Sequence, residues 1–145
     1  MQVNRKSSES FCQIFCISFL HKLQKSGHDF LVWSTPNGGS RNKVEAGRLK
    51  LEGCLSGVLD ITLMSKGIIH FIELKTKSGV LSENQKAFIA SAERYGFGVT
   101  IIKGDAVAEV LPQVMAVMNK TFNIPLIDMH PVLSETLKNS EIFLK

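Results

Sequence analysis

Residues 57–75, GVLDITLMSKGIIHFIELK, contain two apolar, β-branched runs separated by the dipeptide Lys66-Gly67. Two such runs joined by a two-residue turn are typical of a β-hairpin. If this dipeptide forms the turn, Asp60 lies opposite Glu73, and Lys75 shares their face because side chains alternate along a strand. A shift of the pairing by one residue would place Asp60 on the other face. The stretch therefore predicts two carboxylates and one ammonium group on one side of a hairpin.

Two facing carboxylates repel each other, and in apolar surroundings at least one of them would have a raised pKa. A divalent cation removes this repulsion. Oxygen ligands at such a separation suit Mg²⁺ or Mn²⁺, which bind one or two carboxylates together with water and phosphate oxygens. The alternative is that Asp60 marks the start of a strand and that Glu73 and Lys75 form a solvated ion pair at a sheet edge.

Polar residues on otherwise apolar helical faces help to decide between a metal site and a solvated ion pair. Gln85 shares a face with Phe88 and is directed inward, although the pattern of residues 82–85, SENQ, is also explained by a helix capping box. Glu9 and Gln13 lie one turn apart in an otherwise apolar first helix. A solvated helix face explains these two residues equally well.

Helical and strand patterns alternate along the chain. Ser8 and Asp105 are expected as helix caps, and residues 36–39, PNGG, as a turn. We expect helices over residues 8–26, 43–51, 82–95, 105–119 and about 133–144, and strands over residues 30–35, 58–64, 68–75 and 98–103. This order predicts an α/β domain built around one mixed sheet.

Composition and cysteine usage exclude several classes of protein. With 145 residues, 44% hydrophobic and 21% charged, the chain fits one globular domain, and no apolar run is long enough for a membrane-spanning helix. The basic start of the chain resembles a short signal peptide, but no cleavage site follows, so a structural helix is expected. Three cysteines without paired spacing indicate a reducing compartment. Cys12, Cys16 and His21 leave a zinc site open as the alternative to buried small residues.

Residues 37–50 carry four basic side chains and one acidic side chain, an excess of three in a chain whose net charge is +4. Glycines in this segment let backbone amides approach phosphate groups, and such contacts hold nucleic acid without reading its sequence. A solvated basic loop is the alternative. The residues expected to bind nucleic acid are Asn37, Gly38, Gly39, Arg41, Arg48, Lys50 and Lys77.

Residues 57–60, GVLD, and 71–75, FIELK, resemble the Asp…Glu-x-Lys core of the PD-(D/E)XK nucleases. The surrounding succession is more specific, and it is similar to the VRR-NUC domain, the virus-type replication–repair nuclease branch of that superfamily. It comprises residues 36–42 (PNGGSRN), 48–50 (RLK), Gly53, Gly57, 79–82 (GVLS), Gln85 and Gly96. The resemblance covers about residues 8–103. Leu59 departs from the family, which usually has a proline before the aspartate, and that proline shapes the backbone rather than the chemistry.

The resemblance implies a restriction-endonuclease-like αβββαβ core, with helices flanking a mixed sheet. We expect this nuclease domain over residues 1–119, and a helical tail over residues 120–145 that contributes to an oligomer interface. The implied metal ligands are Asp60, Glu73, Glu9 and the Leu74 carbonyl. The implied catalytic side chains are Asp60, Glu73, Lys75, Gln85 and Glu9.

The implied activity is metal-dependent hydrolysis of DNA phosphodiester bonds, with Mg²⁺ or Mn²⁺ as cofactor. Nothing in the chain resembles a base-reading helix, so we expect an endonuclease selective for DNA structure. Small stand-alone members of the family resemble Holliday-junction resolvases, which implies a homodimer acting on branched DNA in DNA repair, in the cytoplasm of a bacterium or of a phage- or virus-infected host cell. The alternative is a nucleic-acid-binding module that keeps the fold without cutting, against which the joint presence of Asp60, Glu73, Lys75 and Gln85 argues.

Overall fold

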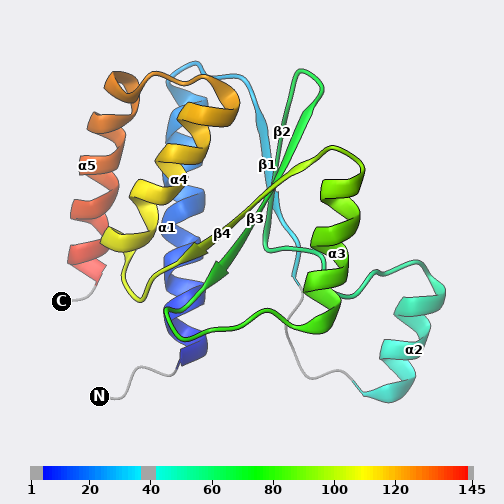
Figure 1. The fold of residues 1–145 in the computed structure, drawn as a ribbon. Coiled ribbons are helices and arrows are strands. Elements are labelled where there is room, and N and C mark those ends of the chain that lie inside the picture. The colour runs from blue at the N-terminus through cyan, green and yellow to red at the C-terminus, as the bar shows by residue number, and fades with distance from the viewer. Residues whose placement is uncertain (1–4, 37–41, 144–145) are drawn as a thin grey trace.

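The computed structural model describes residues 5–36 and 42–143, without the side chains of residues 5–8. The helices are α1 (Arg5–Lys25), α2 (Lys43–Leu51), α3 (Glu83–Arg94), α4 (Val107–Phe122) and α5 (Leu126–Phe143). The strands are β1 (Leu31–Ser34), β2 (Ile61–Ser65), β3 (Ile68–Lys75) and β4 (Gly98–Lys103). Apart from the inserted α2, the order from α1 to β4 is the expected αβββαβ core (Figure 1).

The sheet contains the hairpin that the sequence predicts. Its strand order is β1-β2-β3-β4, with β1, β2 and β3 antiparallel and β4 parallel to β3. Ile61 pairs with Ile72 and Ser65 with Ile68, which leaves Lys66-Gly67 as the turn. Both turn residues have positive φ angles, 47° and 82°, as a two-residue turn that follows the twist of the strands requires. The predicted register is therefore confirmed.

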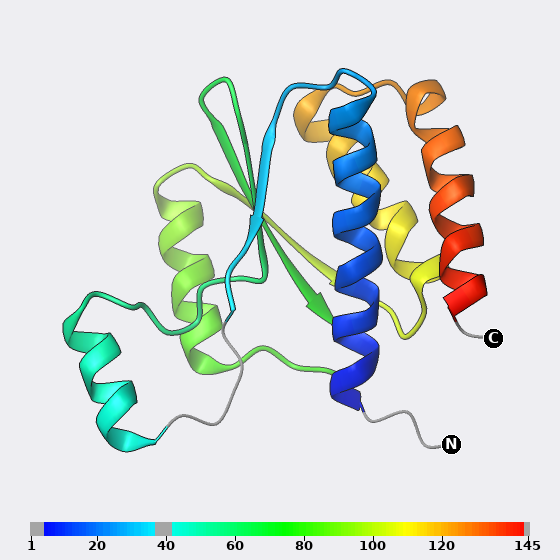
Figure 2. The ribbon, with the colours of Figure 1, turned by 180° about the vertical axis from the view of Figure 1, so that it is seen from behind.

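The sheet separates two unequal layers of helices. The helices α1, α4 and α5 lie on one side of it and α3 on the other (Figures 1 and 2). The main core lies on the first side and includes Phe19 of α1, Leu111 of α4 and Ile72 of β3. On the second side, Phe71 packs edge-on against Phe88 of α3, with 5.0 Å between the ring centroids. Residues of β3 that alternate with Ile72 therefore face the α3 side.

The C-terminal helix completes the larger layer. α5 packs against α1 and α4, and its Met129 belongs to the same core. The buried hydroxyl of Thr136 lies 3.4 Å from the Lys22 ammonium group of α1. The expected helical end of the chain is thus confirmed, although it begins at Leu126 rather than near residue 133 and contains Pro131. A proline inside a helix removes one backbone hydrogen bond, and here packing against α1 and α4 offsets that loss.

Three further boundaries differ from the sequence predictions. α1 begins at Arg5, so Ser8 lies inside the helix and is not its cap. α4 follows Ala106, and Asp105 does not cap it; the Asp105 carboxylate instead accepts a 3.0 Å hydrogen bond from the Lys77 amide. β2 begins at Ile61 rather than at residue 58, because the segment before it forms a turn.

α2 extends away from the rest of the molecule (Figure 1). None of its residues is buried. Its start is stabilised by Asn42, whose side chain accepts a 2.7 Å hydrogen bond from the Glu45 amide. Because a helix this short is marginally stable alone in water, its cap and flanking contacts matter for its persistence.

Cys12 and Cys16 are buried in the core, as expected for small apolar residues, and Cys54 is exposed. Burial raises the pKa of the Cys16 thiol, which keeps this group protonated. Among the described residues, no group of three or more histidine, cysteine, aspartate or glutamate side chains is arranged to hold a metal ion. No helix in the described part of the chain is long and apolar enough to cross a membrane.

Candidate active site

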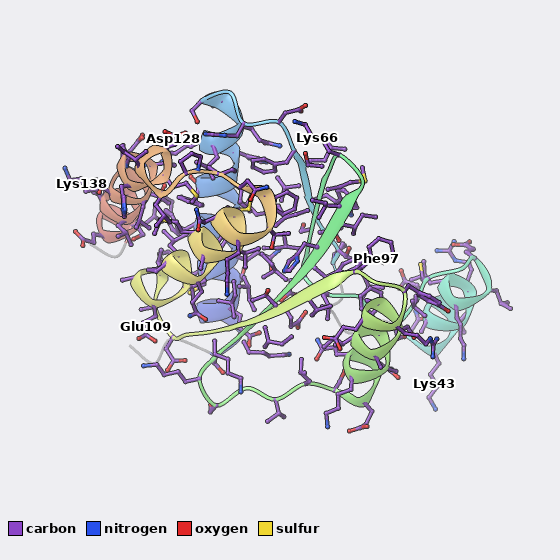
Figure 3. All side chains as sticks on the ribbon, turned by 45° about the horizontal axis from the view of Figure 1, so that its top comes forward. Lys43, Lys66, Phe97, Glu109, Asp128 and Lys138 are labelled. Atoms are coloured by element: carbon purple, nitrogen blue, oxygen red, sulfur yellow. The ribbon has the colours of Figure 1, made fainter. Side chains whose placement is uncertain are left out.

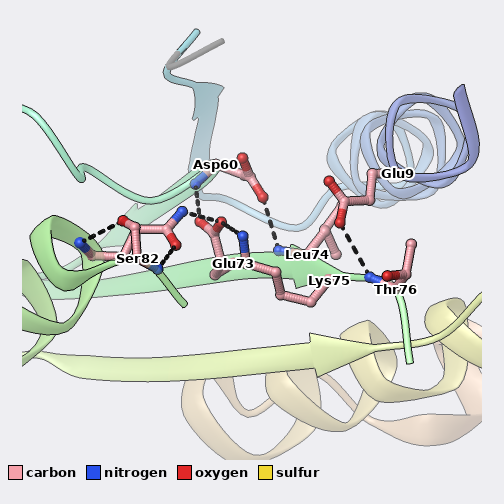
Figure 4. Close-up of polar contacts among 8 residues, drawn as sticks. Glu9, Asp60, Glu73, Leu74, Lys75, Thr76 and Ser82 are labelled. Carbon is pink, nitrogen blue, oxygen red and sulfur yellow. Dashed lines mark hydrogen bonds and ion pairs between the residues drawn. The ribbon is translucent and has the colours of Figure 1, made fainter. Parts of the chain in front are cut away.

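The predicted acidic pair lies where β2 begins and β3 ends. Asp60 precedes β2, and its backbone N–H donates a 3.1 Å hydrogen bond to Oε2 of Glu73. In return, the backbone N–H of Leu74 donates to Oδ2 of Asp60 at 2.8 Å (Figure 4). The Asp60 carbonyl accepts from the Thr35 amide at 2.9 Å, which ties the residue to the end of β1. Asp60 and Glu73 therefore lie opposite each other, as the turn predicts.

Glu73 is almost completely buried, with 2% of its surface exposed. Its Oε1 accepts a 2.6 Å hydrogen bond from Gln85 Nε2, and the Lys75 ammonium group lies 3.3 Å from the same oxygen. Burial and the negative charge of Asp60 raise the pKa of Glu73 to about 7. Burial also raises the pKa of Asp60, although the Leu74 amide and the Lys75 charge oppose this shift. The Lys75 ammonium group thus does not fully offset the effects that raise the pKa values of the buried Glu73 and the half-buried Asp60.

Gln85 has both of the roles that the sequence leaves open. Its backbone N–H donates to the Ser82 hydroxyl at 3.1 Å, and its Oε1 accepts from the Ser82 amide at 2.9 Å, which completes the capping box of α3. The other end of the same side-chain amide contacts Glu73. The capping-box signal locates Gln85 in the sequence, but the part that Ser82 has in orienting its amide was not predicted.

Glu9 approaches the site from α1. Its Oε1 accepts a 3.2 Å hydrogen bond from the Thr76 amide, just beyond the end of β3 (Figure 4). Its charge contributes to the raised pKa of Asp60. Glu9 therefore lies near Asp60 and Glu73. In the described part of the chain, however, the three carboxylates are not close enough together to form a metal site of three acidic ligands.

The donor set fits a hard divalent cation. Asp60 and Glu73 present carboxylate oxygens from adjacent strand ends, and Mg²⁺ typically takes one or two carboxylates and fills its remaining positions with water and substrate oxygens. Burial is the main cause of both raised pKa values, and a cation here would favour the charged form of both carboxyl groups. The Leu74 carbonyl and Glu9 remain predicted ligands.

The residues predicted to bind nucleic acid are only partly brought together. Asn37, Gly38, Gly39 and Arg41 lie outside the described residues. Arg48 and Lys50 are on α2, where Arg48 forms a 2.8 Å ion pair with Glu52. Lys77 lies beyond β3 and pairs with Glu109 at 3.0 Å.

A groove of about 890 Å³ lies between α2, the turn before Asp60 and the first turn of α3. Its lining includes Lys50 on one side, and Gly57 and Gln85 on the other.

The structure thus places two facing carboxylates and a lysine at the end of a hairpin in an α/β domain. No protein-family model matches the sequence, and no curated protein matches it. Solved structures with a similar fold include one described as "VRR_NUC domain protein", with a TM-score of 0.54 and 18% identity over 75% of this chain and 86% of that chain. Another, described as "VRR_NUC domain", has a TM-score of 0.49 and 19% identity over 79% of this chain and 97% of that chain.

The first of these similarities shows the fold. The chain has the fold of a VRR_NUC domain, and the resemblance predicted from the sequence is confirmed at that level. Only 18% of the residues are identical, so the similarity does not extend to activity or substrate.

Proposed function

We propose that this protein is a Mg²⁺- or Mn²⁺-dependent DNA endonuclease that hydrolyses phosphodiester bonds, preferentially in branched DNA such as Holliday junctions. One observation carries the proposal: Asp60 and Glu73 are in contact at the end of the hairpin, beside Lys75, and the pKa values of both carboxyl groups are raised. Such a pair becomes favourable in its charged form when a cation joins it. The VRR_NUC fold supports the same assignment.

The chain supplies three kinds of group to the reaction. A Mg²⁺ or Mn²⁺ ion, when bound, supplies Lewis acidity toward phosphate and lowers the pKa of water. Asp60 and Glu73 would hold the ion, with Glu9 and the Leu74 carbonyl as further ligands. Lys75, whose side chain is 15% exposed, provides a fixed positive charge that stabilises negative charge developing on the phosphate, and it orients the attacking water. Gln85 keeps the Glu73 carboxylate oriented through its 2.6 Å hydrogen bond.

The way the molecule presents its charge supports selection by DNA structure rather than by base sequence. α2 extends from the body and carries exposed Lys50 beside the groove that leads to the site. Contacts of this kind grip the phosphate backbone without reading bases. A homodimer would place two such sites on one junction and would allow paired cuts.

The test is to incubate the purified protein with a four-way junction, a flap, a duplex and a single strand, in Mn²⁺, in Mg²⁺ or in a chelator. We expect metal-dependent cleavage that favours the branched substrates. Asp60→Ala and Lys75→Ala should each reduce the rate by about a hundredfold or more while the protein stays folded. The first removes a proposed metal ligand, and the second removes the positive charge beside the reacting phosphate. Lys138→Ala is the matched control for the lysine, since Lys138 lies on α5, on the opposite side of the molecule from α2 (Figure 3).

Full metal-dependent cleavage by either site variant would contradict the proposed mechanism. Binding of the junction without cleavage under any metal condition would favour the alternative, a non-cutting module with the nuclease fold. Neither binding nor cleavage of any substrate would contradict both.

A further inference from the structure

The turn before Asp60 lies directly against the first turn of α3. Gly57 in this turn has a φ angle of +86°, and a Cβ atom there would collide with the carbonyl carbon and oxygen of Asn84 and lie 2.7 Å from the backbone nitrogen of Gln85. These are backbone atoms, so they cannot turn aside as the end of a flexible side chain can. The two segments approach this closely only because residue 57 has no side chain.

The backbone that Gly57 contacts is the one that orients Gln85. The Oε1 atom of Gln85 accepts from the Ser82 amide at 2.9 Å, and this commits the oxygen end of the side-chain amide. The Nε2 end is then directed at Glu73, where it donates the 2.6 Å hydrogen bond to Oε1. A shift of the first turn of α3 would move this donor away from the carboxylate.

The same turn also controls the other oxygen of Glu73. Gly57 lies three residues before Asp60, whose backbone N–H donates to Oε2 of Glu73 at 3.1 Å. Glu73 is therefore held from two segments, one leading into β2 and one opening α3. Gly57 lies where these two segments touch.

We propose that Gly57 is a positioning residue of the site: its missing side chain lets the turn before Asp60 lock against α3, so that Asp60 and Gln85 together fix the Glu73 carboxylate. The inference rests on the proposed function for its effect on cleavage. Its structural part concerns the orientation of Gln85 and stands in the metal-free protein.

A simpler account is that residue 57 must be glycine only because its φ angle is positive. Gly96 separates the two accounts. It follows α3 at the opposite end, has a φ angle of +87°, and a Cβ atom there would have nothing within 4 Å. Gly96→Ala therefore introduces the same backbone strain as Gly57→Ala without the collision.

The experiment compares wild type, Gly57→Ala, Gly96→Ala, Gln85→Ala and the Gly57→Ala/Gln85→Ala double variant. Thermal unfolding, Mn²⁺ affinity, and kcat and KM on a four-way junction are measured for each. The NMR signals of the Gln85 side-chain amide are measured for the three proteins that keep Gln85. We expect Gly96→Ala to lower the unfolding temperature only. Gly57→Ala should move the Gln85 amide signals toward those of a solvated amide and lower kcat by about a hundredfold, with KM little changed, because a displaced carboxylate mispositions the chemistry rather than the DNA. The double variant should be no slower than the slower single variant, since both act through Glu73.

Equal behaviour of Gly57→Ala and Gly96→Ala in amide signals and kcat would overturn the inference while leaving the proposed function intact. If wild type neither binds Mn²⁺ nor cuts, the proposed function fails, and the amide signals alone still decide whether Gly57 orients Gln85. If Gly57→Ala does not fold, Ser82→Ala takes its place, because it loosens the same turn without adding a Cβ atom to the contact. Displaced amide signals together with a loss in kcat would then support the inference, and unchanged kcat with displaced signals would overturn it.

Discussion

Glu73 is the most constrained charged group of the site. Oε2 accepts from the Asp60 amide, and Oε1 is shared between Gln85 and the Lys75 ammonium group. Each carboxylate oxygen can accept about two hydrogen bonds or ligand contacts, so these interactions orient the group and still leave room for a cation. The consequence is a carboxylate already oriented before a metal or DNA arrives.

The raised pKa of Glu73 predicts pH-dependent metal binding. Because burial and the charge of Asp60 raise this pKa to about 7, a proton competes with the cation below neutral pH. The Mn²⁺ affinity should rise by about tenfold between about pH 6 and pH 8, as the competing proton is lost. Calorimetry in buffers of different ionisation enthalpy measures both the affinity and the proton released. Glu73→Gln should bind more weakly and with a flatter pH profile; an unchanged profile would contradict the prediction.

The raised pKa of Glu73 has the opposite consequence for the stability of the metal-free protein: metal affinity rises with pH, whereas the free energy of unfolding falls. The native state keeps a proton on Glu73 that the unfolded chain has already lost, so the free energy of unfolding should fall as the pH rises from the ordinary value of 4.5 to about 7. Adding Mn²⁺ at pH 8 should restore stability, because the cation binds only the native arrangement. Denaturant unfolding of wild type and Glu73→Gln, with and without Mn²⁺, measures this difference.

At the scale of single elements, α2 is the helix that we propose contacts DNA. Removing the exposed charge with Lys50→Ala should weaken binding of all DNA sequences alike and lower the slope of log affinity against log salt by about 0.9, since one phosphate contact is lost. Arg48→Ala should have a smaller effect, because Arg48 already forms a 2.8 Å ion pair with Glu52. Fluorescence titration of a labelled junction at several salt concentrations measures both. An unchanged slope for Lys50→Ala would show that α2 does not contact the backbone.

Short-range sequence patterns predicted the strands and helices around the site well. The features that they did not predict depend on contacts between residues distant in the sequence. The Lys66-Gly67 turn fixes the register of its own hairpin, so the pairing of Asp60 with Glu73 follows from short-range geometry. The Ser82 capping box is equally local. Asp105 was wrong as a helix cap because its carboxylate accepts from the Lys77 amide, a partner distant in sequence. The close approach of Gly57 to α3 likewise appears only when the chain is folded.

At the scale of the whole molecule, the larger helical layer contributes Glu9 of α1 to the neighbourhood of the site. The helices α1, α4 and α5 form one packed layer across the sheet from α3 (Figure 2). Its outer helix, α5, exposes apolar side chains, including Ile127 and Ile142, which are 79% and 69% exposed. Apolar groups of this kind on an outer helix are suited to contact between two copies of the chain.

The predicted homodimer can therefore be tested on α5 without touching the site. Wild type should have twice the 16.0 kDa mass of one chain in light scattering at micromolar concentration. The Ile127→Ser/Ile142→Ser variant should be a folded monomer, because it removes apolar area that association would bury. It should nick a four-way junction on one strand where the dimer makes paired cuts. Leu51→Ser is the control for the mass, since Leu51 is 91% exposed but lies on α2. A dimeric double variant would exclude α5 as the interface, and a monomeric wild type would contradict the dimer itself.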